Sequence, residues 1–120
     1  MTTDLEPEPE SARQILGDRL EHAREFAAHL AEEGEELGLI GPLEAARLWS
    51  RHLLNCALVA PLLTAGARVG DVGSGAGLPG LVLAIARPDV ELVLIEPMER
   101  RTTWLLAETE RLGLRNVTVL

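Results

Sequence analysis

The side chains best suited to chemistry lie in one ten-residue stretch that is rich in glycine. It begins at Asp71, ends at Gly80 and reads Asp-Val-Gly-Ser-Gly-Ala-Gly-Leu-Pro-Gly. Glycines permit positive φ angles and let a ligand approach the backbone closely. The stretch fits G-x-G-x-G from Gly73 and G-x-G-x-x-G from Gly75. Both patterns predict a ligand-binding loop. The first is typical of proteins that bind S-adenosylmethionine and the second of proteins that bind a dinucleotide, so the glycines alone do not decide between these ligands.

Two carboxylates narrow the choice of ligand. Asp71 lies two residues before the first glycine, where it would repel a pyrophosphate but attract the ammonium and sulfonium of S-adenosylmethionine. Glu96 follows Gly77 by 19 residues, close to the spacing of an acid that binds ribose hydroxyls, which both kinds of ligand carry. The charge of Asp71 therefore favours S-adenosylmethionine as the cofactor. The predicted cofactor-binding residues are Asp71, Gly73, Gly75, Gly77, Leu78 and Glu96.

Each of these residues also has a purely structural interpretation. The glycine loop could be a tight turn without a ligand, although glycines weaken a fold unless close approach is used. Asp71 could cap N–H groups of the loop. Glu96 could cap the helix near Met98, and Leu78 could anchor the helix that follows the loop. Capping the loop would not prevent Asp71 from also binding a ligand.

The loop needs a strand before it and a helix after it, and the neighbouring residues predict both. An alternation of strands and helices is typical of a doubly wound α/β fold. The sequence therefore predicts the first three strands of a Rossmann-like S-adenosylmethionine-dependent methyltransferase fold. The expected elements are a strand at 68–72, a helix at 79–87, a strand at 90–95, a helix at 98–112 with Leu105, Leu106 and Leu112 toward the core and Gly113 as its C-cap, and a strand at 117–120.

The first 65 residues are expected to be mainly helical. An apolar face at steps of three and four predicts one helix over residues 11–33. The cluster of Glu32, Glu33, Glu35 and Glu36 is expected to be a solvated face or the end of that helix. A second helix is expected from Pro42, with a turn near Asn55. The predicted division is a disordered acidic tail (1–10), an N-terminal helical region (11–65) and the first half of the methyltransferase domain (66–120).

Composition excludes several classes of protein. The chain has 120 residues, of which 47% are hydrophobic, so it can form a packed core. Its one cysteine cannot form an internal disulfide, and no apolar stretch is long enough to span a bilayer. No Cys/His cluster suggests a metal. We therefore expect a soluble, cytoplasmic, monomeric protein without metal or membrane.

The net charge of −8 is concentrated in the first 44 residues, which hold twelve acidic and three basic side chains. The remaining residues hold seven acidic and eight basic side chains, and every basic side chain is arginine. A nucleic-acid-binding protein usually has a basic surface. The charge therefore argues against RNA binding by this portion alone.

Four stretches together resemble the RsmG family, also called GidB. Besides the loop they are Arg47 to Cys56, Glu96 to Arg101 and Gly113 to Val117. The Gly-Leu-Pro-Gly end of the loop, together with the upstream pair Arg51 and His52, is the most specific part of the resemblance. One departure is that the family commonly has Asp-Ser where this chain has Asn55-Cys56.

The resemblance implies a Rossmann-like methyltransferase with an N-terminal helical cap. It implies methyl transfer from S-adenosylmethionine to N7 of one guanine in the 16S rRNA of the small ribosomal subunit. Arg51 and His52 would then be substrate-binding residues. Members are about twice as long as this chain, so 120 residues alone are expected to bind cofactor weakly and to be inactive, with an open edge at strand 68–72.

Other interpretations stay open at this stage. Arg51 could be an ion-pair partner, and His52 and Trp49 could be core residues. The chain as a whole could be a methyltransferase for a small molecule or a protein, a dinucleotide-binding oxidoreductase module, or a non-catalytic truncated domain.

Overall fold

The computed structural model describes residues 5–120 and contains one sheet of three parallel strands. The strands are β1 (Arg68–Val72), β2 (Glu91–Ile95) and β3 (Val117–Val119), in the spatial order β1-β2-β3. All three strands are where the sequence predicts them, within one residue. The helical elements are α1 (Ser11–Leu16), η1 (Gly17–Arg19), α2 (Leu20–Glu33), η2 (Ala45–Arg47), η3 (Leu48–Leu53), α3 (Leu54–Ala57), η4 (Ala60–Leu62), α4 (Gly80–Ala86) and α5 (Glu99–Arg111).

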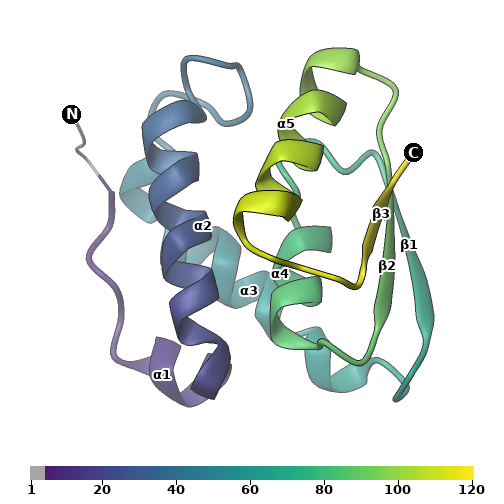
Figure 1. The fold of residues 1–120 in the computed structure, drawn as a ribbon. Helices are drawn as coiled ribbons and strands as arrows, with labels where there is room; N and C mark the ends of the chain where they lie inside the picture. The colour runs from purple at the N-terminus through teal and green to yellow at the C-terminus, as the bar shows by residue number, and fades with distance from the viewer. Residues whose placement is uncertain (1–4) are drawn as a thin grey trace.

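The helices lie in layers on one face of the sheet (Figure 1). Helices α4 and α5 lie next to the strands, and α1, α2 and α3 lie beyond them. A helix that is apolar all round must be buried, and α4 has the sequence Gly-Leu-Val-Leu-Ala-Ile-Ala with its first six residues buried. Helix α4 therefore joins the N-terminal helices and the sheet into one hydrophobic core.

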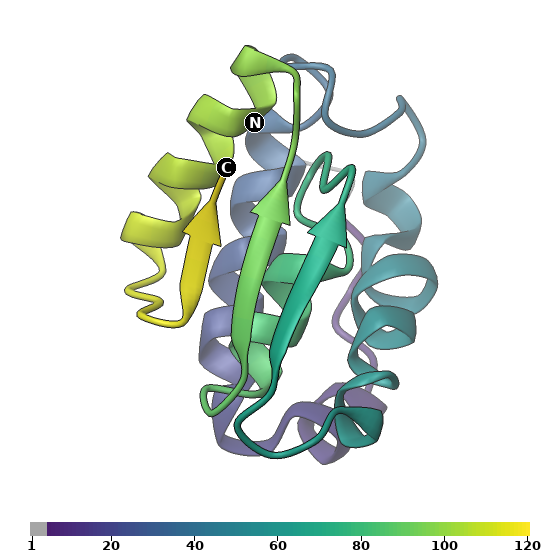
Figure 2. The same ribbon diagram turned by 90° about the vertical axis from the view of Figure 1, so that its right-hand side faces the viewer.

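The other face of the sheet carries no helix among residues 5–120 (Figure 2). Val72 is 80% exposed there and Ile95, its partner in the register of β1 and β2, is 37% exposed. Parallel sheets are normally covered on both faces. The described residues also leave the outer edge of β1 unpaired, as the sequence predicts.

The N-terminal region is less regular than its sequence predicts. Gly17 has a φ of 56° and separates α1 from α2, so residues 11–33 are not one helix. Pro42 lies in a turn, and the second helical run starts at Ala45. The predicted turn near Asn55 is wrong, because Asn55 lies within α3 and its side-chain amide donates to the backbone oxygen of Arg51, 2.9 Å away.

Helix α5 corrects the predicted core at one position. Leu105 and Leu112 are buried as expected, but Leu106 is 53% exposed. Adjacent helical residues point about 100° apart, and the buried face of α5 is centred on Trp104, Leu105 and Glu108, which leaves Leu106 at its solvent side. The buried face is instead continued by Glu108, whose exposure is 0%. The C-cap of α5 is Leu112, and Gly113 follows it with a φ of 66°, so the predicted glycine stop lies one residue after the cap.

Glu108 belongs to a polar cluster, the α2–α5 clamp, formed by His29, Glu33, Trp104, Glu108 and Arg111. The Nδ1 atom of His29 lies 2.7 Å from Glu108 Oε2, and Arg111 Nη2 lies 2.6 Å from Glu108 Oε1. Glu33 accepts hydrogen bonds from Trp104 Nε1 at 2.8 Å and from Arg111 at 2.9 Å. The expectation that the whole glutamate cluster is solvated is therefore wrong for Glu33.

The predicted acidic tail falls partly outside the described residues, since residues 1–4 are not described. Glu6 donates its backbone N–H to the oxygen of Ala45 at 2.9 Å, and Glu8 forms an ion pair with Arg24. The boundaries of the tail and of the regions 11–65 and 66–120 stay predictions. No helix of the described part of the chain is long and apolar enough to cross a membrane.

Candidate cofactor site

The glycine loop leaves β1 and is fixed by the end of β2. The backbone N–H groups of Gly73 and Ser74 both donate to the oxygen of Ile95, at 2.7 and 3.2 Å. Gly73 and Gly75 have φ angles of 77° and 57°, which residues with a side chain rarely adopt. A Cβ atom at Gly73 would meet nothing within 4 Å, so the backbone there is open to a ligand.

Two other glycines of the loop serve close packing. A Cβ atom at Gly77 would lie 2.6 Å from Leu81 Cδ1, and Gly77 has a φ of 87°. At Gly80 a Cβ atom would overlap the side chains of Leu94 and Asp71. The glycines of one motif therefore have two roles: the early ones leave space, and the late ones let α4 approach the sheet.

Asp71 caps the loop with one carboxylate oxygen. Its Oδ2 accepts the backbone N–H of Gly80 at 3.1 Å, as the structural interpretation predicts. The side chain is half-buried, and Oδ1 has no hydrogen-bond partner among the described residues. Burial raises the pKa of Asp71, the negative charge of Glu96 raises it further, and the bonds from Gly80 and Ser74 oppose the rise. A cation beside Oδ1 would offset this unfavourable burial of charge.

Glu96 bridges the ends of two elements. Its Oε1 accepts the N–H of Gly75 at 2.8 Å, and its Oε2 accepts the N–H of Met98 at 3.0 Å, at the start of α5. These two bonds lower its pKa, helped by the nearby charge of Arg101. Only 6% of Glu96 is exposed. The capping role expected for Glu96 is thus present, and each oxygen keeps one further lone pair for a ligand hydroxyl.

Ser74 is a residue of this site that the sequence analysis did not single out. It is 2% exposed, and its Oγ donates to the backbone oxygen of Asp71 at 2.8 Å. Its position between two glycines was the available signal, because a small hydroxyl can close a tight loop on its own backbone. Leu78 is half-buried and packs against the core, which agrees with the anchor interpretation.

The upstream pair lies in η3, a π-helical stretch of six residues. Such stretches are rare and are often found at functional sites. Arg51 is exposed and has no ion pair among residues 5–120, so it is not the ion-pair partner that was considered. His52 is half-buried and its Nε2 lies 2.5 Å from Glu44 Oε1. Trp49 is 2% exposed, which confirms it as a core residue.

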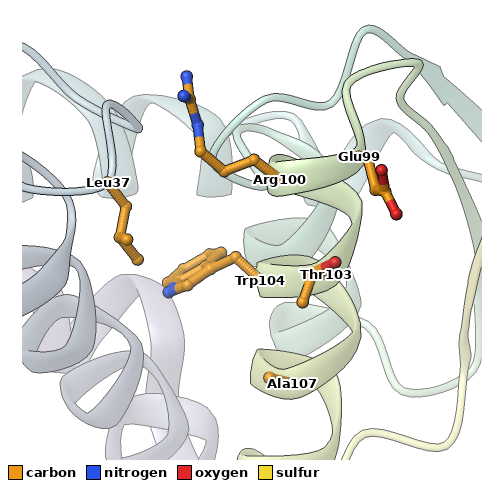
Figure 3. Close-up of a pocket in the computed structure, with 6 residues that line it drawn as sticks. All are labelled: Leu37, Glu99, Arg100, Thr103, Trp104 and Ala107. Atoms are coloured by element: carbon orange, nitrogen blue, oxygen red, sulfur yellow. The ribbon is translucent and has the colours of Figure 1, made fainter.

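A separate hollow of about 520 Å³ lies between the loop after α2 and the first turns of α5 (Figure 3). Leu37 and Trp104 face one another across it, Arg100 extends over its upper side, and Glu99 points away (Figure 3). None of its six lining residues is a predicted site residue. The hollow therefore does not belong to the glycine loop. Within residues 5–120, no three His, Cys, Asp or Glu side chains come together as a possible metal site.

Comparison with known proteins identifies the family of this site. The family model described as GidB, rRNA small subunit methyltransferase G, matches residues 19–120, which include the glycine loop and both acids. The chain belongs to the GidB family. This confirms the resemblance seen in the sequence, and the three parallel strands with N-terminal helices agree with part of a Rossmann-like methyltransferase fold.

Curated relatives of the GidB family are similar to the whole chain. A protein of Leifsonia xyli named "Ribosomal RNA small subunit methyltransferase G" is 66% identical over 120 residues, covering 100% of this chain and 57% of the relative. Proteins with the same name from Clavibacter michiganensis and Streptomyces avermitilis are 65% and 52% identical, covering 96% and 98% of this chain and 54% and 49% of each relative. The chain thus spans about half the length of the curated relatives it matches.

Proposed function

We propose that the natural gene product containing residues 1–120 transfers a methyl group from S-adenosylmethionine to N7 of a guanine in the 16S rRNA of the small ribosomal subunit, in the cytoplasm. The observation that carries the proposal is the family match over residues 19–120. The matched residues contain the glycine loop, Asp71 and Glu96. All three meet at the carboxyl ends of β1 and β2, where ligands bind in open α/β sheets.

The residues present fit S-adenosylmethionine. A Cβ atom at Gly73 would meet nothing within 4 Å, so the loop that follows β1 has room for a ligand. Asp71 Oδ1 is a half-buried carboxylate oxygen without a partner in the described part of the chain, and it suits a cationic group. The further lone pairs of Glu96 suit ribose hydroxyls.

The bound cofactor supplies a methyl group activated by its sulfonium. The role of the protein is to hold that methyl group in place. Asp71 would bind the cationic portion of the cofactor, and Glu96 would bind its ribose. Gly73 and Gly75 would allow the backbone to approach the cofactor closely. Guanine N7 carries a free lone pair, so no proton has to be removed before it attacks. The protein then needs orientation of the two reactants rather than a strong base.

The start of α4 argues against a dinucleotide-binding oxidoreductase module. A pyrophosphate would need free N–H groups at that helix start. The N–H of Gly80 already donates to Asp71, and the N–H of Leu81 donates to Gly77. A pyrophosphate would therefore meet a carboxylate where it needs a donor.

Calorimetric titration of the natural gene product tests the cofactor. We expect S-adenosylhomocysteine to bind more tightly than NAD. Tighter binding of NAD would contradict the proposal and favour the oxidoreductase.

A methyl-transfer assay tests the substrate. We expect labelled methyl from S-adenosylmethionine to appear in 16S rRNA when small ribosomal subunits are the acceptor, and nuclease mapping to locate it as 7-methylguanine. Cofactor binding without methylation of small subunits would instead favour a small-molecule or protein substrate, or a non-catalytic domain.

A further inference from the structure

The carboxylate of Glu44 makes the shortest contact to a predicted substrate residue. Its Oε1 lies 2.5 Å from His52 Nε2, and its Oε2 accepts from Arg47 Nη2 at 2.7 Å. These two bonds lower the pKa of Glu44, His52 contributing most, so Glu44 is ionised at neutral pH. An ionised carboxylate only accepts hydrogen bonds. The Nε2 atom of His52 must therefore carry the hydrogen.

The backbone around His52 is held by contacts that do not involve Glu44 side-chain atoms. Glu6 donates its N–H to Ala45 and accepts the N–H of Ser50, both at 2.9 Å. Trp49 and Leu53 are 2% and 1% exposed and anchor η3 in the core. Glu44 is thus placed to orient the imidazole ring rather than to hold the helix.

The helical stretch that carries His52 continues into α3, and α3 packs against α4, the helix that begins at the end of the glycine loop. Cys56 follows His52 by four residues, close to one helical turn. Burial raises the pKa of the Cys56 thiol to about 11, and the negative charge of Asp71 adds to that rise. The His52 side chain is 30% exposed, and its Nδ1 has no hydrogen-bond partner among residues 5–120.

We propose that Glu44 is a positioning residue for the RNA substrate: its carboxylate fixes His52 with the hydrogen on Nε2, which leaves Nδ1 as an acceptor for an N–H group of a substrate nucleobase. The proposal rests on the proposed function and deepens it. A neutral imidazole without a fixed partner exchanges between two tautomers and offers an acceptor at either nitrogen. Glu44 removes that ambiguity before the substrate arrives, so that the acceptor is preorganised.

The two described histidine–carboxylate pairs use opposite ring nitrogens, which supplies an internal control. His29 contacts Glu108 through Nδ1, whereas His52 contacts Glu44 through Nε2. Imidazole nitrogen NMR of the natural gene product, at a pH where the rings are neutral, should show hydrogen on Nε2 of His52. Glu44→Ala should convert His52 to a tautomer mixture, Glu44→Gln should keep the tautomer through its amide oxygen, and neither should change His29.

Methylation of small subunits then tests the role in binding. Glu44→Ala should lower kcat/KM about tenfold, mainly through KM for the subunit, because a substrate hydrogen bond loses its fixed acceptor. Glu44→Gln should retain most of kcat/KM. The affinity for S-adenosylhomocysteine and the unfolding midpoint should stay at wild-type values. Glu21→Ala is the matched control, since it also removes a carboxylate paired with an arginine (Arg24), on α2.

A double-mutant cycle separates positioning from an independent effect. In a His52→Ala background, Glu44→Ala should cause no further loss of kcat/KM. The proposal would be overturned if the losses of kcat/KM caused by His52→Ala and Glu44→Ala multiply in the double variant. It would also be overturned if His52 keeps its tautomer in Glu44→Ala. If the wild-type protein fails to methylate small subunits, the proposed function falls and the substrate role of Glu44 with it. A wild-type protein that methylates normally while Glu44→Ala keeps full kcat/KM overturns the Glu44 proposal alone.

Discussion

The glycine loop and the α2–α5 clamp both contain two carboxylates, but they use them differently. In the loop, backbone N–H groups bind Asp71 and Glu96, and among residues 5–120 the hydroxyl of Ser74 is the one side-chain donor that also acts on Asp71. In the clamp, Glu33 is bound by side chains of the facing helix, and Glu108 lies between His29 of the facing helix and Arg111 of its own helix. A backbone donor positions a carboxylate without neutralising its charge, whereas a facing arginine neutralises it.

This difference separates a site that can take a cation from a contact that holds two helices together. Asp71 remains half-buried with a raised pKa, so its charge gains from a ligand. The charge of Glu33 is already compensated, and its pKa is lowered to about 2 by Arg111, with a smaller contribution from Trp104. Variants in the clamp should therefore change stability, and variants in the loop should change ligand affinity.

Arg111→Ala should give the largest effect. It leaves the fully buried Glu108 with His29 as its one remaining partner in the clamp. Because Arg111 itself is 37% exposed, we expect a loss of about 2–3 kcal/mol rather than the full cost of breaking a buried ion pair. Urea unfolding of the natural gene product measures the loss. Adding Glu108→Gln to Arg111→Ala should recover part of it, because no unpaired charge is then buried. A loss below about 1 kcal/mol would show that the clamp does not stabilise the fold.

Gly80→Ala should affect both stability and ligand binding. The new methyl group would overlap Leu94 and displace the carboxylate of Asp71. We expect a loss of about 1–3 kcal/mol in stability and a clear loss of affinity for S-adenosylhomocysteine by calorimetry. Gly70→Ala is the matched control, since a Cβ atom there meets nothing within 4 Å. Equal behaviour of the two variants would contradict the role given to Gly80.

Asp71→Asn should weaken cofactor binding with little change in stability. Asparagine keeps an oxygen for the N–H of Gly80 but removes the negative charge. We expect S-adenosylmethionine to lose about 1–3 kcal/mol of binding free energy, as for loss of a charged hydrogen bond. Calorimetry at two salt concentrations measures it. An unchanged affinity would show that Asp71 only caps the loop.

Glu33→Gln should give the smallest effect, seen as a change in pH dependence. The pKa of Glu33 is lowered from 4.5 to about 2 in the folded protein. Its contribution to stability is therefore present above about pH 4.5 and is lost as the pH falls toward 2. The thermal midpoint of Glu33→Gln should fall less steeply than that of the wild type over this interval. Glu32→Gln, a change at the exposed neighbour, should retain the wild-type slope.

Most of the α/β region, residues 66–120, could be predicted from the sequence because the sequence signals of its strands and helices are local. The strand at 91–95 and the helix at 80–86 follow from continuous apolar runs, and Gly113 marks a helix end. Asp71 was assigned to the ligand by charge alone, and the structure leaves one of its oxygens available for that role. The cofactor-binding roles of the loop residues, and of Arg51 and His52, stay predictions.

What could not be predicted depends on contacts between distant residues. Glu33 was expected to be solvated because its partners, Trp104 and Arg111, lie more than 70 residues away. The π-helical pitch of η3 has no simple sequence signal, and no pattern in the sequence singles out Glu44. Leu106 was misplaced because neighbouring leucines give no indication of which one faces the core.

The hydrogen bonds of the glycine loop also order the events of folding. Three successive N–H groups, those of Gly73, Ser74 and Gly75, donate to residues 95 and 96 rather than to the loop itself. Bringing the loop next to the end of β2 closes the chain segment between them, which costs conformational entropy. This cost arises before the hydrogen bonds can offset it. The loop therefore acquires its native shape only after β2 has docked beside β1. The surface on which the chemistry would depend therefore forms no earlier than the pairing of β1 with β2.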